Sequence, residues 1–407
     1  MNRHNSVQQP PVGRAWRWLM LLLLALPNFG TNYAQFQLSA FAADFMADFG
    51  ITTAQFSAVA LSFTIVTGIV GVTGGMLADK FGVKRVAIVC GLITGTVSLL
   101  RLLVHSYAAF FGISLFMGAF LGCANATSGK IIRAWFPDNQ TGLAFAIYSG
   151  IGAIGISLAQ LMAPIYSGYG QALLISGLVL LSGPFLWMLL GRDTPSGAVL
   201  PPSQSFLKHL SRVMRLKNLW IAALALACFN ALIYSLSALL PTVLSTDLGL
   251  EVTTANRIAS LLNIAAILGM AVLPLVQARL GKYRPLLVSL MSLTAALTVS
   301  MWVAPHNLLL PLVCLTGFFM SVGAPFLMAM LAGLPELDAG CLGSATGLVT
   351  LVQYLLGGFI LPSLAIAPLV DRSGSALFLC AAGLAILIGL GALALPETGS
   401  TSEKQCK

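Results

Sequence analysis

The sequence predicts an all-α membrane protein with twelve transmembrane helices arranged as two pseudo-symmetric six-helix bundles. Three observations lead to this fold class: an apolar composition, a series of apolar runs of membrane-spanning length, and an internal repeat. Of the 407 residues, 58% are hydrophobic and only 8% are charged, and the mean hydropathy is +0.92. So few polar side chains cannot cover a water-soluble globule. A lipid bilayer is therefore the first expected partner.

Each apolar run has the about 20 residues that a helix needs to cross a hydrocarbon core of about 30 Å. The first run is too long, and too polar in its middle, to be a cleaved signal peptide, so it counts as the first helix. The twelve runs cover residues 18–43, 54–77, 84–104, 107–133, 142–168, 170–191, 219–245, 254–277, 284–304, 308–332, 342–369 and 372–395.

One long hydrophilic connection divides the chain into two halves that repeat each other. The segment 51–55 (Ile-Thr-Thr-Ala-Gln) recurs at 252–256 (Val-Thr-Thr-Ala-Asn), and Gly82 recurs as Gly281. Such a repeat predicts two pseudo-symmetric halves. The expected organisation is a cytoplasmic tail at 1–17, a six-helix bundle at 18–191, a linker at 192–218, a second six-helix bundle at 219–395 and a cytoplasmic tail at 396–407.

Basic residues concentrate on one side of the predicted membrane. Loops rich in Lys and Arg are retained in the cytoplasm. Placing the N-terminus inside leaves only three of the 21 basic residues outside, namely Arg101, Arg257 and Arg372. Both termini are therefore predicted to be cytoplasmic, in a plasma membrane of the bacterial inner-membrane type. The net charge of +9 reflects this topology and does not indicate nucleic acid as a partner.

The charged turn between the second and third runs is the most specific motif. Residues 75–85 read Gly-Met-Leu-Ala-Asp-Lys-Phe-Gly-Val-Lys-Arg, and so polar a turn must lie at the membrane surface. The turn resembles the signature of the major facilitator superfamily, in which it joins the second and third transmembrane helices. The resemblance implies a transporter, and it assigns the role of a conformational latch to Gly75, Asp79, Gly82, Lys84 and Arg85.

A plain surface loop is the alternative interpretation of this turn. In the second copy of the turn, at 277–284, Ala278 stands where the first copy has Asp79. A latch is therefore expected to be asymmetric between the halves.

Substrate sites in this architecture lie near the membrane midplane, where polar side chains of the two halves converge. The first and seventh predicted helices each carry polar residues at i, i+4 and i+7, on one helical face. These two stripes are Asn28, Asn32 and Gln35 on the first helix, and Asn230, Tyr234 and Ser237 on the seventh. We expect them to face each other across a central cavity, with bonding between neighbouring helices as the alternative. Further candidates for substrate binding are Tyr33, Asn125, Arg133, Tyr148, Gln160, Asn263, Gln353 and Tyr354. Lys130 and Arg133 end the fourth predicted helix, where a structural anchor is the alternative role; of the two, Arg133 is the better contact for an anion entering or leaving.

The sequence does not determine the coupling ion. No Asp or Glu falls in the middle third of a predicted span, and the four histidines lie in tails or loops. A carboxylate relay for protons is therefore not indicated. Facilitated diffusion, exchange, and symport in which the substrate carries the proton stay open, with a proton or sodium ion as an open partner. The spans contain no cluster of nucleophile, base or metal ligands, so no enzyme, cofactor or metal site is expected. A monomer is expected.

Finer resemblances leave the substrate unnamed. The runs at 142–164 and 357–362 are similar to helices of nitrate/nitrite porters, but the anion-binding arginines of those porters fall at Gly71 and about Met270. A bare nitrate would lack a bidentate partner here. The expected function is secondary active or facilitative transport of a small polar or anionic metabolite by alternating access. A multidrug/proton antiporter is the alternative function, and a non-transporting receptor on a transporter fold is the alternative of another class.

Overall fold

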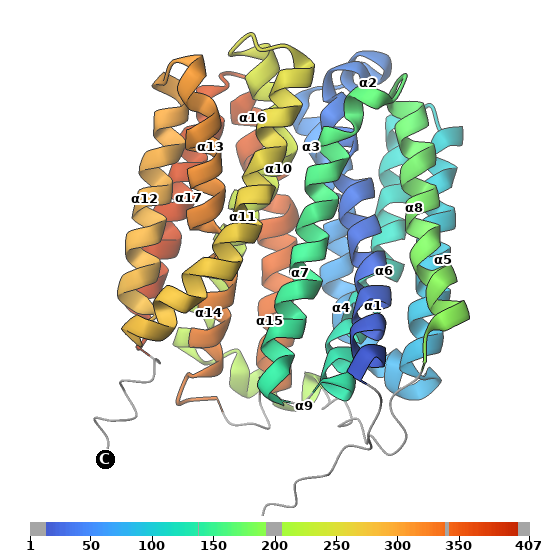
Figure 1. The fold of residues 1–407 in the computed structure, drawn as a ribbon, viewed down its shortest axis with the longest axis vertical. Coiled ribbons are helices and arrows are strands. Elements are labelled where there is room, and N and C mark those ends of the chain that lie inside the picture. Colours follow the sequence, from blue (N-terminus) through green and yellow to red (C-terminus); the bar gives the residue numbers. More distant parts are fainter. Residues whose placement is uncertain (1–13, 137, 193–205, 338–341, 398–407) are drawn as a thin grey trace, which may run out of the picture.

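The computed structural model describes residues 14–136, 138–192, 206–337 and 342–397, and over these residues its regular elements are all helices (Figure 1). The side chains of some helical residues, including Asp79, Asn125 and Arg133, lie outside the description. Ten helices of the described part are long and apolar enough to cross a membrane, and Tyr107–Cys123 is a shorter apolar helical stretch. The chain is therefore a multi-pass membrane protein.

The helices fall into an N half and a C half, joined by a connection that contains the short helix α9 (Phe206–Val213). The N half comprises α1 (Arg14–Phe36), η1 (Leu38–Phe41), α2 (Ala42–Phe49), α3 (Thr53–Leu61), α4 (Phe63–Phe81), α5 (Val83–Leu100), η2 (Arg101–Leu103), α6 (Tyr107–Trp135), α7 (Asp138–Leu161), η3 (Ala163–Ile165) and α8 (Tyr169–Leu190). The C half comprises α10 (Lys217–Thr246), α11 (Val252–Leu280), α12 (Arg284–Val303), α13 (His306–Met320), α14 (Gly323–Ala332), α15 (Leu342–Val352), η4 (Gln353–Ile366), α16 (Ala367–Val370) and α17 (Ser375–Ala394). Each of the twelve predicted runs coincides with one helix or with consecutive helices.

The internal repeat is visible in the backbone. Gly50 and Gly82 have positive φ angles of 60° and 88°, and Gly249 and Gly281, each 199 positions further on, have φ angles of 67°. Residues with a Cβ rarely adopt this conformation. Glycine therefore marks the same two helix boundaries in both halves, before α3 and α5 and before α11 and α12.

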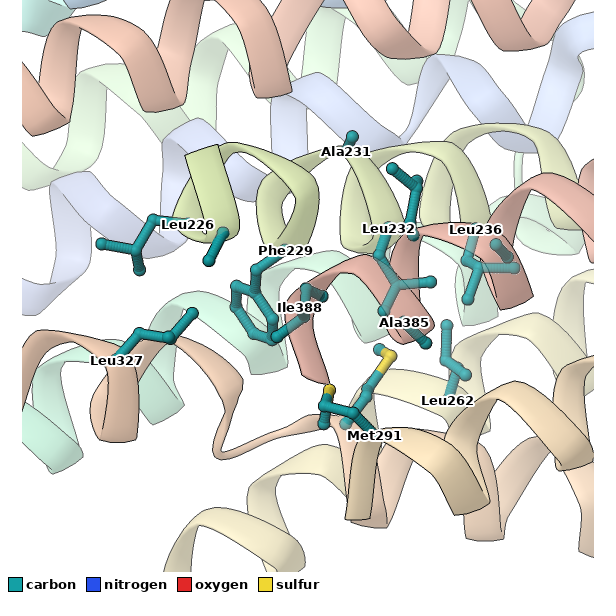
Figure 2. Packing of buried hydrophobic residues seen from close by; sticks show 14 of the residues in the cluster. Leu226, Phe229, Ala231, Leu232, Leu236, Leu262, Met291, Leu327, Ala385 and Ile388 are labelled. Carbon is teal, nitrogen blue, oxygen red and sulfur yellow. The ribbon is translucent and has the colours of Figure 1, made fainter. Parts of the chain in front are cut away.

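The core of the C half is built around α10. This helix packs against α11, α14, α15, η4 and α17, and its side chains Leu226, Leu232 and Leu236 are completely buried. Figure 2 shows these leucines in one apolar cluster with Met291 of α12 and Ile388 of α17, with Leu226 on the side of Leu327. Close packing of apolar side chains on several sides holds α10 in the middle of its half.

Apolar side chains also cover the outside of the bundle. On α11, Leu268, Val272 and Leu275 recur on one helical face and are 60%, 45% and 65% exposed. Such a stripe would be costly in water. Against lipid acyl chains it is the expected surface, which agrees with the hydropathy of the helices.

The two halves meet along two main seams, and α15 also packs against α4. Helix α7 packs against α11, and α3 and α4 pack against η4. We term the end of the bundle at which α1 begins and α17 ends the terminal end, and the opposite end, with α2 and α16, the distal end (Figure 1). In Figure 1, α7 and α11 lie together near the distal end and diverge toward the terminal end.

Candidate functional site

Three tyrosines from both halves gather at mid-depth in the bundle. Tyr148 lies on α7, Tyr234 on α10 and Tyr354 on η4. Tyr354 lies within electrostatic range of both other tyrosines. All three are surrounded by protein, yet each keeps an intermediate accessible surface. This tyrosine cluster thus borders space inside the molecule, and it contains three of the predicted site residues.

The amide side chains of α1 bond within the N half. Nδ2 of Asn28 donates to the carbonyl oxygen of Tyr148 at 3.0 Å, and Nδ2 of Asn32 donates to the carbonyl and side-chain oxygens of Asn28 at 2.9 and 3.1 Å. Gly152 of α7 makes room for both amides, because a methyl group there would lie 2.6 Å from the Asn28 nitrogen. The predicted stripe therefore faces α7, next to the tyrosine cluster.

The amide of α10 bonds within the C half. Nε2 of Gln353 donates to Oδ1 of Asn230 at 3.0 Å, and Nδ2 of Asn230 donates to the carbonyl oxygen of Gln353 at 3.4 Å. The asparagines of both predicted stripes thus bond to neighbouring helices of their own halves. Across the halves, the ring of Tyr234, from the second stripe, meets that of Phe36 with centroids 6.0 Å apart.

Other predicted residues lie closer to the distal end. The hydroxyl of Tyr33 pairs with that of Tyr166 at 2.5 Å. Gln160 joins the halves, because its Nε2 donates to the carbonyl oxygen of Ser237 at 2.9 Å. Within the described part of the chain, the buried side-chain atoms without a hydrogen-bond partner include Gln35 Nε2, Gln160 Oε1 and Asn263 Nδ2, which belong to predicted site residues. Buried polar atoms are nearly always paired, so a bound water or ligand is expected at these atoms.

A cavity of about 40 Å³ lies beside Asn28 and Tyr148, inside the N half. Its polar lining includes Thr31, Thr94 and Ser128, which sequence reasoning missed. Hydroxyls on apolar helices carry no signal in the sequence, since they usually bond to a carbonyl one turn earlier. Thr31 and Thr94 do so here, to Pro27 and Cys90 at 2.8 Å each. The cavity has the size of a few waters at most.

Three other predicted residues, Gly75, Asp79 and Gly82, belong to the charged turn. Of these three, the structure describes only the surroundings of Gly82. It begins α5 with its positive φ of 88°. Nζ of Lys84 donates to the carbonyl oxygen of Gly191 at the end of α8, a bond inside the N half, and Arg85 is exposed. The latch role of the turn stays a prediction, as do the site roles of Asn125 and Arg133, whose side chains lie outside the description.

Two helical halves that meet around a polar cluster at mid-depth define the architecture of a membrane transporter. The family model described as Major Facilitator Superfamily matches residues 21–362. The chain therefore belongs to this superfamily, as the charged turn predicted.

Individual relatives are more distant. The chain is 23% identical over 389 residues to the hexuronate transporter of Bacillus subtilis, covering 89% of this chain and 90% of that one. It is 26% identical over 182 residues to a "Probable sulfoacetate transporter" of Cupriavidus necator, an alignment that spans 44% of this chain and 42% of the relative. A solved bacterial homologue of the human lysosomal transporter Spinster, inward-facing and unoccupied, superposes with a TM-score of 0.68 at 15% identity, covering 94% of this chain and 99% of that one. At this identity the superposition shows the fold alone.

Proposed function

We propose that the chain is a secondary transporter that carries a small organic anion by alternating access of a site between its halves. The tyrosine cluster is the observation that carries this proposal, because it joins Tyr148 of one half to Tyr354 of the other at mid-depth. The relatives add the substrate class, since a hexuronate and sulfoacetate are both organic anions.

The chemistry of the centre suits a polar solute with several oxygens. Tyrosine hydroxyls donate and accept, and the amides beside them supply N–H donors. Among the described side chains no cation lies at this depth, so the charge of the substrate needs a partner from elsewhere. We assign this role to Arg133, near the terminal end of α6. Membrane proteins keep such charges beside their substrate paths.

The terminal end is, in this proposal, the cytoplasmic one, because most of the 21 basic residues belong to it. The hydrogen bonds between described residues of the two halves all lie between mid-depth and the distal end. These contacts support, within this proposal, a state that is closed on the outside of a bacterial inner membrane.

A thermal-shift screen of the purified protein tests the function. We expect glucuronate or sulfoacetate to raise the melting temperature, since a ligand that binds only the folded state stabilises it. Tyr354→Phe should then weaken binding by about 1–3 kcal/mol, the cost of leaving a desolvated polar group unpaired. The melting temperature without ligand should change little.

Tyr166→Phe is the matched control, because it removes a hydroxyl that bonds to Tyr33 away from the cluster. It should lower stability and leave affinity unchanged. A shift with lipophilic cations alone would contradict the proposal and favour the multidrug antiporter. Binding of the anion without its uptake into proteoliposomes would favour the receptor.

A further inference from the structure

The carboxylate of Asp371 connects the two halves at the distal end. Asp371 follows α16 of the C half, and its two oxygens accept hydrogen bonds from the backbone N–H groups of Thr53 and Ala54 of the N half, at 3.0 and 3.1 Å. These residues form the first turn of α3. An anion in this position also interacts favourably with the positive end of the helix dipole.

The N half leaves these two donors free for Asp371. The first N–H groups of a helix have no partner within it. Thr52 and Gln55 form a capping box, in which the Thr52 side chain accepts from the Gln55 N–H and the Gln55 side chain accepts from the Thr52 N–H. The N–H groups of Thr53 and Ala54 then remain, and the other half of the protein supplies their acceptor. The cap of α3 is complete only when the distal ends of the halves are together.

The contact continues from the distal end toward the tyrosine cluster. Below Asp371, the buried hydroxyls of Ser57 and Ser363 bond across the halves at 3.1 Å. Deeper still, Gly358 lies against Thr64 and Gly68 lies against Tyr354, so closely that a methyl group on either glycine would come within 3.0 Å of the opposing Cβ. One antiparallel pair of segments thus links the Asp371 contact to Tyr354.

The start of α11 is related to the start of α3 by the internal repeat, and among the described residues no carboxylate of the other half caps it. The corresponding helix α11 begins after Glu251, whose side chain makes no capping bond. There the halves are joined by an amide, Asn256, whose Nδ2 donates to the carbonyl oxygen of Ala40 at 3.3 Å. In the described part of the chain, the charged contact at the distal end therefore belongs to the α3 side alone.

We propose that Asp371 is a gate residue, which holds the distal end closed by capping α3 across the two halves and must release it before the central site can open there. This inference rests on the proposed alternating access. Because Tyr354 lies on η4 and Asp371 directly follows α16, which continues η4, a substrate that moves η4 at the tyrosine cluster also moves the cap.

The test measures the distance between the halves at the distal end. His105 and His306 are exposed, repeat-related residues beside η2 and at the start of α13. Spin labels on His105→Cys and His306→Cys, in a background without the native cysteines, report closed and open populations by pulsed electron resonance. We expect Asp371→Ala to raise the ratio of open to closed by about 3- to 30-fold, the effect of losing a helix N-cap. Asp371→Asn keeps one acceptor and should give a smaller increase.

Asp247→Asn is the matched control. Asp247 also lies at the distal end, and its Oδ1 accepts from the N–H of Gly374 at the start of α17, within the C half. This variant should lower the melting temperature and leave the distance distribution unchanged.

Each outcome bears on the proposal. If the wild type shows two populations and Asp371→Ala leaves their ratio unchanged, the gate role of Asp371 is overturned. Alternating access would then still hold. An equal shift in Asp247→Asn would also overturn it, because a general loss of stability would then explain the effect. One unchanging distance in the wild type and all variants, with and without substrate, would overturn alternating access and the gate together.

Discussion

At the scale of single residues, the site depends on a glycine as much as on its polar side chains. Asn28 and Asn32 place their amide nitrogens over Gly152, where a methyl group would lie 2.6 and 3.0 Å from them. The absence of a side chain at this one position of α7 lets the Asn28 amide reach the backbone of Tyr148 while the Asn32 amide donates to Asn28. Small residues commonly permit such close approaches between membrane helices.

We predict that Gly152→Ala weakens both substrate binding and stability. The added methyl must displace the Asn28 amide, and overpacking of this kind costs about 1–3 kcal/mol. Gly150→Ala is the matched control, since a methyl there meets nothing within 4 Å. It should be neutral or stabilising by up to about 1 kcal/mol, because alanine favours the helix. Melting temperatures and ligand titrations of both variants test this prediction. If Gly150→Ala has the same effects as Gly152→Ala, Gly152 has no special role.

The residue scale also shows what the sequence could predict of the site. Asn28 and Asn230 stand out because amides are rare in apolar runs. The pairing of these amides with Tyr148 and Gln353, also candidates, was not predictable, because the partners lie 120 and 123 positions away in the chain. The stripes were predicted to face each other; their asparagines bond to neighbouring helices of their own halves, while Tyr234 meets Phe36 across the halves. Helical periodicity gives the face of a residue, and only the tertiary packing decides which helix that face meets.

At the scale of elements, peripheral helices are tied in equivalent pairs at the terminal end. In the N half, Lys84 near the start of α5 donates to the carbonyl of Gly191, just after α8. In the C half, the Glu397 carboxylate, after α17, accepts from the backbone N–H groups of Tyr283 and Arg284 at the start of α12, at 2.9 and 3.0 Å. Different chemistry thus joins the same pair of helices in each half.

We predict that Glu397→Gln lowers the free energy of unfolding by about 0.5–2 kcal/mol, the cost of a weakened helix cap. Because the bond lies within one half, the ratio of open to closed populations at the distal end should stay at the wild-type value. Thermal melting and the distance measurement between labelled positions 105 and 306 check the two statements. Lys84→Met should behave alike; a changed population ratio in Lys84→Met would instead support the latch role predicted for the charged turn.

The predicted run at 342–369 shows which features of a helix sequence patterns predict and which they do not. Its apolar length indicated a spanning helix, and α15, η4 and α16 together fill it. The π-helical winding of η4 was not predictable, because composition does not distinguish helix types. Within η4, Pro362 removes a backbone donor and Gly357 packs directly on the backbone of Ala227. Contacts with α10 and α4, distant in sequence, therefore decide its geometry.

At the scale of the whole molecule, the repeat was predictable and the closed end was not. Glycines with positive φ before α3 and α11 mark boundaries that recur in the sequence itself. Which end of the halves is closed depends on pairs such as Ser57 with Ser363, which are 306 positions apart and carry no signal in composition. The balance between such states amounts to a few kcal/mol in proteins with two conformations, too little for sequence patterns to show.

The orientation of the molecule in the membrane gives the last prediction. The distribution of basic residues predicts that the terminal end lies in the cytoplasm. His105 is exposed beside η2 near the distal end, and Lys282 is exposed between α11 and α12 at the terminal end. In intact cells whose outer membrane has been permeabilised, a membrane-impermeant thiol reagent should label His105→Cys, and Lys282→Cys only after the inner membrane is lysed. The protein whose native cysteines are replaced, and into which no new cysteine is introduced, is the control that should not be labelled. The reverse pattern would invert the topology, and the Asp371 contact would then close the cytoplasmic side.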